Sequence, residues 1–197
     1  MRRPAWFIVF LCAAAGIPAC GSGAPKAQRP ISLDAVPIQY GGGGAVQTSF
    51  CVSPAQWEKL QEGLGPAADP ADERRRICLA IGLMERIAGE QTITWMDKPM
   101  NGSHGPREQG QLDCIDESKN TQAYLTLFEQ KGLLRWHVVR ESVWRAPLLV
   151  DTHRTAVVED VTDGRRYVID SWFGSAGDPA KSQALSEWMS KAPFPAD

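Results

Sequence analysis

Cys114, His153 and Asp170 are, in chain order, residues of the three types that together perform nucleophilic acyl transfer. Cys114 follows Asp113, a residue type that favours the N-cap of a helix, so the cysteine lies at the start of a predicted helix. The unpaired N–H groups and partial positive charge of a helix N-terminus favour a thiolate and can stabilise an oxyanion. We therefore predict that Cys114 is a nucleophile rather than a buried structural cysteine.

His153 and Asp170 lie on consecutive predicted strands that form a hairpin. Side chains alternate along a strand, and both registers that the hairpin allows keep these two residues on one face. A two-residue turn at Asp163-Gly164 places His153 opposite a residue beyond Asp170, whereas a four-residue loop over 160–163 places it opposite Asp170. We expect the second register, or a bulge with the same effect. The imidazole would then take the proton of the thiol, and the carboxylate would fix the tautomer of the ring.

The elements that must position these residues are predicted from helix caps and hydrophobic spacing. Ser53-Pro54 and Asp69-Pro70 each combine a cap residue with a proline at the first helical position, and Gly132 ends the helix that begins near Asp113. Helices followed by antiparallel strands indicate an α+β fold. Helices are expected over about 53–62, 70–89, 113–130 and 182–190, and strands over 134–140, 143–149, 152–159 and 165–172.

Residues 1–19 have the features of an export signal. Arg2-Arg3 precede an apolar segment shorter than a membrane-spanning helix, and Ile17-Pro18-Ala19-Cys20 resembles a lipobox. We predict an exported, periplasmic lipoprotein anchored in the membrane through lipid on Cys20, with simple cleavage after Ala19 as the alternative. Residues 20–48, rich in glycine and proline, are expected to form a flexible tether to a single domain over 49–197.

The composition is that of a globular domain and not of a nucleic-acid-binding chain. The 197 residues are 43% hydrophobic and 22% charged, with a net charge of −2. This balance provides no basic field that would bind nucleic acid. The histidines and cysteines show no metal-ligand spacing, so neither a metal nor a cofactor is expected.

The segments around the three candidate residues resemble a known enzyme family. They are Gly110-Gln111-Leu112-Asp113-Cys114-Ile115-Asp116, the helix that follows to Gly132-Leu133, His153, and Gly164-Arg165-Arg166-Tyr167-Val168-Ile169-Asp170. A glycine before the cysteine, an acidic residue two positions after it, and the order cysteine, histidine, aspartate resemble the transglutaminase-like superfamily of papain-type thiol enzymes. The resemblance covers about residues 75–172. It implies a nucleophilic Cys114, a basic His153, an orienting Asp170, and acyl transfer on amide bonds by a peptidase, amidase, deamidase or crosslinking enzyme.

Two further residues are candidates for the site. Gln111 precedes the nucleophile, and because side-chain amides can donate to an oxyanion, it is the expected oxyanion donor. His137 is an alternative base that we consider less favoured than His153.

The cysteines are expected to divide by role. Of five, Cys12 leaves with the signal and Cys20 carries lipid. A disulfide between Cys51 and Cys78 would leave Cys114 reduced, whereas two separate buried thiols are the alternative.

Three classes of function follow from these observations. The first is a thiol enzyme that acts on an envelope peptide or protein, and it requires the Cys114 sulfur near a ring nitrogen of His153 with Asp170 behind the ring. The second is a non-catalytic module that binds a peptide or protein on the same fold. The third is a purely structural envelope lipoprotein, in which Cys114 would be buried without a partner.

Overall fold

A computed structural model describes residues 30–102, 109–146 and 152–195 of the chain. The expected signal sequence, the lipid-bearing Cys20 and the first part of the expected tether lie outside these residues. Within them, no helix has both the length and the apolar character that crossing a membrane requires.

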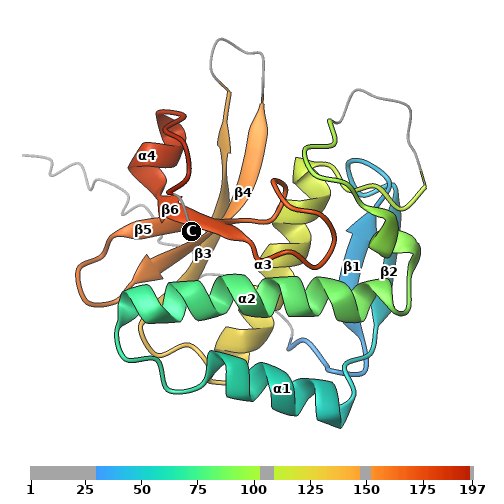
Figure 1. The fold of residues 1–197 in the computed structure, drawn as a ribbon, viewed down its shortest axis with the longest axis horizontal. Coiled ribbons are helices and arrows are strands. Elements are labelled where there is room, and N and C mark those ends of the chain that lie inside the picture. The colour runs from blue at the N-terminus through green and yellow to red at the C-terminus, as the bar shows by residue number, and fades with distance from the viewer. Residues whose placement is uncertain (1–29, 103–108, 147–151, 196–197) are drawn as a thin grey trace, which may run out of the picture.

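The described part of the chain has an α+β fold with two antiparallel sheets (Figure 1). The smaller sheet is a hairpin of β1 and β2, and the larger has the strand order β3-β4-β5-β6. The predicted fold class is therefore confirmed. The elements are β1 (Val36–Tyr40), β2 (Val46–Phe50), α1 (Pro54–Leu64), α2 (Pro70–Gly89), the 3-10 helix η1 (Ile93–Met96), α3 (Cys114–Gln130), β3 (His137–Arg145), β4 (His153–Asp160), β5 (Arg166–Asp170), β6 (Lys181–Ala184) and α4 (Leu185–Met189).

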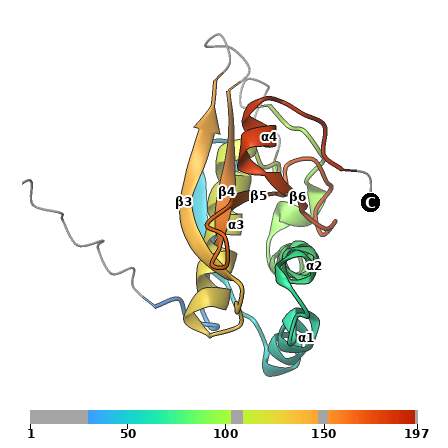
Figure 2. The ribbon, with the colours of Figure 1, turned by 90° about the vertical axis from the view of Figure 1, so that its left-hand side faces the viewer.

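The core surrounds α3, the helix that begins with Cys114. Helix α3 contacts β3, β4 and β5 of the larger sheet and also β1. Helix α2 crosses α3 and packs against α1 and β6 (Figures 1 and 2). Burial of each large apolar side chain stabilises the fold by about 1.5 to 3 kcal/mol, so this core holds α3 firmly in place. Its buried residues include Ile77, Ile81, Met84, Leu125, Phe128, Val158 and Ile169.

Side-chain caps explain where the three long helices begin. Ser53 forms a reciprocal capping box with Gln56 at the start of α1, and Asp69 caps α2. Asp113 caps α3 by accepting hydrogen bonds from two backbone N–H groups of its first turn. Because each cap satisfies N–H groups that a helix leaves unpaired, the predicted helix starts are confirmed.

The expected tether over 20–48 is wrong for its second half, where β1 and β2 form a paired hairpin. Val36 and Ile38 of β1 are buried in the core. Residues 41–44, the glycine run that resembles a linker, form the hairpin turn, and all four have positive φ. Glycine adopts this conformation without steric cost, so the run serves a tight turn and the ordered domain begins before residue 49.

The hairpin between β4 and β5 has neither of the registers considered from the sequence. In this register the β4 residue opposite Asp170 comes two positions after His153, so the expected direct pairing of His153 with Asp170 is wrong. The loop is residues 161–164, one position later than expected, because Asp160 still pairs and its carboxylate caps the turn. Gly164 closes the loop with a φ of 72°.

Candidate active site

Cys114 is the first residue of α3, one position after the cap residue Asp113. Its side chain is 7% exposed. The sulfur lies 4.0 Å from the backbone oxygen of Thr152, which directly precedes His153. The structure therefore places the candidate nucleophile at a helix N-terminus and at the start of β4.

The first turn of α3 is held by the β1–β2 hairpin. Three N–H groups of the glycine turn 41–44 donate to the carboxylates of Asp113 and Asp116 at 2.6 to 2.8 Å. Successive N–H groups of this kind form a concave surface that stabilises negative charge. The two carboxylates beside Cys114 are thus compensated by backbone dipoles, which limits their opposition to a neighbouring thiolate.

His153 and Asp170 meet across β4 and β5. His153 Nε2 lies 2.8 Å from Asp170 Oδ2, and both side chains are almost completely buried. The two residues are diagonal neighbours on one face of the sheet, and such neighbours remain within reach of an aromatic or long side chain. The shifted register therefore still produces the contact that we expected from a direct pair.

The hydrogen bond to Asp170 decides how the imidazole of His153 can act. Burial of the ring lowers its pKa, but the bond to Asp170 and the neighbouring Cys114 sulfur outweigh burial and raise the pKa to about 9. The other ring nitrogen, Nδ1, is buried and has no hydrogen-bond partner among the described residues, so no hydrogen bond joins it to the Cys114 sulfur in this structure. Asp170 thus fixes Nε2 as a protonated nitrogen, and Nδ1 is the ring nitrogen that is left without a partner.

Aromatic rings enclose the imidazole of His153. The ring centroid of Trp172 lies 4.6 Å from that of His153, and those of Trp188 and Phe173 lie 5.5 Å and 5.6 Å away. The Trp188 indole N–H also donates to Asp170 Oδ2 at 3.0 Å. Sequence analysis gave no site role to these residues, since Trp188 reads as the apolar residue of a short helix and its contact depends on how α4 folds back.

Gln111, the expected oxyanion donor, is engaged elsewhere. Its side-chain amide donates to the Met96 carbonyl at 2.6 Å, and its side-chain oxygen accepts from the Lys98 N–H and from Asn101. No hydrogen bond joins it to Cys114 among the residues that the structure describes. The side chain fastens the 96–101 loop. Asp113 already accepts from the N–H groups of Ile115, Asp116 and Glu117, so in the described first turn of α3 the N–H of Cys114 itself is the remaining candidate for an oxyanion donor.

The expected disulfide between Cys51 and Cys78 is not formed in this structure. Cys51 is exposed at the end of the first hairpin, and its thiol donates to the backbone oxygen of Asp34 at 3.0 Å. Cys78 is buried on α2, where it belongs to the core. The two side chains thus have different environments, one at the surface and one inside. The expected lipidation at Cys20 lies outside the described residues.

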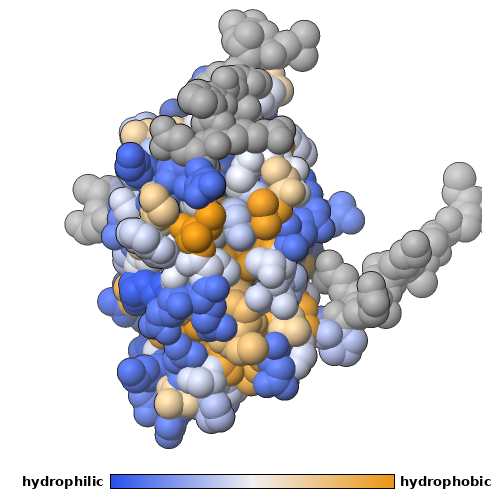
Figure 3. Space-filling view, turned by 90° about the vertical axis from the view of Figure 1, so that its right-hand side faces the viewer, coloured by the Kyte–Doolittle hydropathy of each residue, from blue (hydrophilic) through white to orange (hydrophobic). Residues whose placement is uncertain are grey.

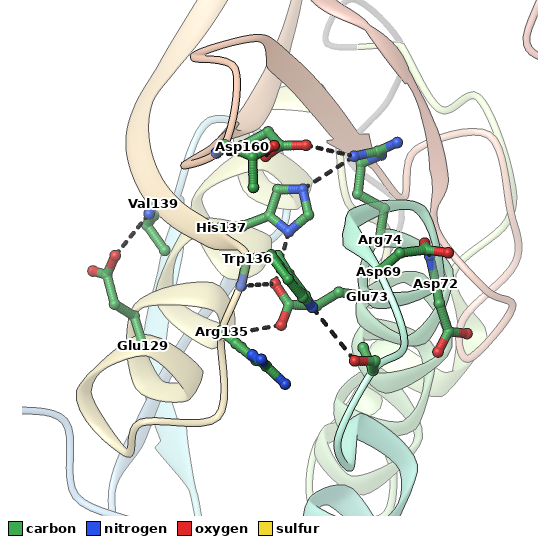
Figure 4. A network of polar contacts seen from close by, with 12 residues as sticks. Asp69, Asp72, Glu73, Arg74, Glu129, Arg135, Trp136, His137, Val139 and Asp160 are labelled. Atoms are coloured by element: carbon green, nitrogen blue, oxygen red, sulfur yellow. Dashed lines mark hydrogen bonds and ion pairs between the residues drawn. The ribbon is translucent and has the colours of Figure 1, made fainter.

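His137, the alternative base, belongs to a separate buried network (Figure 4). Its Nδ1 lies 2.7 Å from Glu73 Oε2, and its Nε2 lies 3.2 Å from an Arg74 nitrogen. Because arginine can only donate, Nε2 accepts and Nδ1 donates to Glu73. Arg74 also lies 3.5 Å from Asp160. With both nitrogens engaged, His137 joins α2 to the sheet and has no free nitrogen for a thiol.

Three carboxyl groups that sequence analysis did not single out converge beneath the first turn of α3. Glu85, Asp97 and Glu117 line a cavity of about 10 Å³, the size of one water molecule, together with Tyr124. Burial raises the pKa of Glu85 to about 8 and that of Asp97 to about 6, and it raises the pKa of Glu117 well above its usual value. They come from α2, a loop and α3, so no local pattern could have grouped them.

Exposed apolar side chains gather on η1 and the loop after it, at Ile93, Trp95, Met96 and Met100. Trp95 is 65% exposed. Figure 3, which views the molecule from the side of η1 and β2, shows hydrophobic patches separated by polar residues. The Met100 N–H donates to the Trp172 carbonyl at 2.8 Å, so this surface adjoins the aromatic residues around the imidazole.

Comparison of the chain with protein-family models, with curated proteins and with solved structures gives no match. In the described residues, no group of three or more histidine, cysteine, aspartate or glutamate side chains is arranged to hold a metal ion. The assignment to the α+β class is therefore based on the observed helices and sheets, and the candidate site is based on the contacts between its residues.

Proposed function

We propose that this protein is a thiol enzyme that performs acyl transfer on amide bonds, with Cys114, His153 and Asp170 as its catalytic residues. The observation that carries the proposal is the 2.8 Å bond from His153 Nε2 to Asp170, since it leaves Nδ1 as the ring nitrogen that can exchange a proton with Cys114. In the first step, the thiolate attacks the carbonyl carbon and the histidine protonates the departing amine. In the second step, water or an amine attacks the thioester and regenerates the thiol.

The protonation state of His153 suits this sequence of steps. A pKa of about 9 keeps the imidazole positively charged at neutral pH, where it stabilises the Cys114 thiolate as an ion pair. When the sulfur bonds to the carbonyl carbon, the negative charge passes from the sulfur to the carbonyl oxygen. This lowers the proton affinity of the ring and favours proton delivery to the amine, which then departs as the thioester forms.

The proposed fold type is the transglutaminase-like core that the sequence resembles. A nucleophile at the start of a helix, packed against an antiparallel sheet that carries the histidine and aspartate, supports this assignment. We extend the proposal to an exported protein, anchored in the membrane through lipid on Cys20, that acts in the periplasm. No metal, cofactor or nucleic acid enters the mechanism.

A peptide or protein of the cell envelope is the proposed substrate. The exposed apolar side chains from Ile93 to Met100 belong to a segment that is bonded to Trp172 through the Met100 N–H, and they suit an extended segment of a peptide better than a small hydrophilic amide.

A non-catalytic binding module is the second candidate. It is favoured by the burial of the Cys114 side chain, which is only 7% exposed and offers a substrate little access to the sulfur. If the protein is instead an enzyme, the residues that cover the Cys114 sulfur must move aside when a substrate binds.

Covalent labelling separates the two candidates. The protein is treated with a set of peptidyl acyloxymethyl ketones, which form thioethers with activated thiolates, and the sites are mapped by mass spectrometry. The enzyme predicts labelling of Cys114 that is lost in His153→Ala, while the exposed Cys51 thiol in the same molecule stays largely unlabelled. Equal labelling of both cysteines, or none at Cys114, favours the binding module.

A further inference from the structure

The Asp170 carboxylate is held by two donors on one oxygen. Asp170 Oδ2 accepts from His153 Nε2 at 2.8 Å and from the Trp188 indole N–H at 3.0 Å. Trp188 has no exposed surface, and its ring also packs against the imidazole at a centroid distance of 5.5 Å. One side chain therefore contacts both the carboxylate and the ring that the carboxylate orients.

Arg145 holds Trp188 from the other side. Its guanidinium carbon lies 4.3 Å from the centroid of the indole, and a guanidinium nitrogen donates to the Trp188 backbone oxygen at 2.7 Å. Arg145 is also directly opposite His153 in the pairing of β3 with β4. The cation–π contact and the hydrogen bond from the same guanidinium together favour one orientation of the indole.

The contacts form a continuous sequence from β3 to the imidazole of His153. Arg145 fixes the indole, the indole N–H fixes the Asp170 oxygen, and that oxygen fixes Nε2 of His153. Helix α4, which supplies Trp188, is only five residues long and has no side-chain N-cap. Because so short a helix has little stability of its own, these contacts hold it in place.

We infer that Trp188 is a positioning residue, whose indole N–H fixes the Asp170 carboxylate and thereby the orientation of His153, with Arg145 holding the indole. The inference rests on the proposed function and goes beyond it, because it places part of the catalytic geometry on the C-terminal helix.

The test removes the N–H and keeps a ring. In Trp188→Phe, we expect the titration midpoint of His153, followed by ¹⁵N NMR, to shift by about one pH unit, because the carboxylate that sets this midpoint loses a donor. We also expect alkylation of Cys114 by iodoacetamide at pH 6 to slow about tenfold, as the loss of one hydrogen bond to a charged group predicts. Trp144→Phe is the matched control. Trp144 also lies against an arginine, Arg154, but it is half exposed, and in the described part of the chain no hydrogen bond or ring contact joins it to His153, Asp170 or Trp188.

A second replacement keeps the test decisive if Trp188→Phe does not fold. 3-Benzothienylalanine at position 188 has the shape of tryptophan with sulfur in place of the N–H, and we expect the same two changes. An unchanged His153 midpoint in a folded variant overturns the inference, as does an equal effect of Trp144→Phe. If wild-type Cys114 instead reacts as an ordinary thiol, the proposed function fails, while the His153 midpoint still decides the role of Trp188.

Discussion

His153 Nε2 lies 2.8 Å from Asp170 Oδ2 although the two residues are diagonal, and not opposite, across β4 and β5. The imidazole can bridge this offset because a diagonal separation on one sheet face is within reach of an aromatic side chain. The contact engages Nε2, so Nδ1 is the ring nitrogen without a partner, and Cys114 is a neighbour of the ring. This relationship is the basis of the proposed thiol chemistry.

Replacement of Asp170 by asparagine tests the electrostatic part of this contact. Asp170→Asn keeps the size of the side chain and removes its charge, so the pKa of His153 should fall from about 9 towards 6.5. A histidine with a raised pKa stabilises the folded state fully below about pH 6.5, and this contribution disappears as the pH rises through about 9. We therefore expect urea denaturation to show a loss of about 1 to 3 kcal/mol at pH 6 and a smaller loss at pH 10. An equal loss at both values would contradict the charge-based account.

The separate role of His137 is tested at its partner, Glu73. Glu73 accepts from His137 and from the backbone N–H groups of Arg135 and Trp136, and its side chain is buried. Removing one member of a buried charged network costs about 3 kcal/mol, so Glu73→Gln should lower the free energy of unfolding by roughly that amount. The alkylation rate of Cys114 should not change in the folded variant. A stable variant with an unreactive Cys114 would instead identify His137 as the base.

The fold was largely predictable where the signals are local. The residues Ser53, Asp69 and Asp113 cap their helices as the sequence predicts, because capping depends on only a few neighbouring residues. The glycine run 41–44 reads as a flexible linker in the sequence, but it forms a turn whose conformation is held by hydrogen bonds to a distant part of the chain. Its N–H groups bind carboxylates on α3, about 70 residues further along the chain.

The candidate site was predictable in its residue types and not in its surroundings. Cys114, His153 and Asp170 follow from chemistry and element order, and the structure places His153 against Asp170. Trp188 could not be found because its indole reaches Asp170 only after β6 and α4 fold back over β5. The prediction that Gln111 donates to an oxyanion fails because its side-chain amide binds the backbone of the loop at Met96 and Lys98, and no local pattern indicates that contact.

The carboxyl groups beneath α3 should make stability depend on pH. Burial raises the pKa of Glu85 to about 8 beside Asp97, Glu117 and Asp178, so the folded state holds a proton that the unfolded state releases near pH 4.5. Stability should therefore fall as the pH rises from about 4.5 through about 8. Glu85→Gln keeps an acceptor for the Gly177 N–H and removes the ionisation. We expect thermal denaturation to show the variant more stable than wild type at pH 8, by about 1 to 3 kcal/mol, and nearly equal at pH 4. A variant that is less stable at pH 8 would refute the protonated state of Glu85.

The central claim is that His153 activates Cys114, and the rate of iodoacetamide alkylation as a function of pH tests it most directly. Wild type, His153→Ala and Cys114→Ser are compared by mass spectrometry, and the exposed Cys51 is the reference thiol within each molecule. The account predicts that Cys114 is alkylated well below the usual thiol pKa of about 8.5 and that His153→Ala slows this at pH 6 by at least about tenfold, with Cys51 unaffected. Alkylation of Cys114 that follows an ordinary thiol curve, unchanged by His153→Ala, would contradict the account.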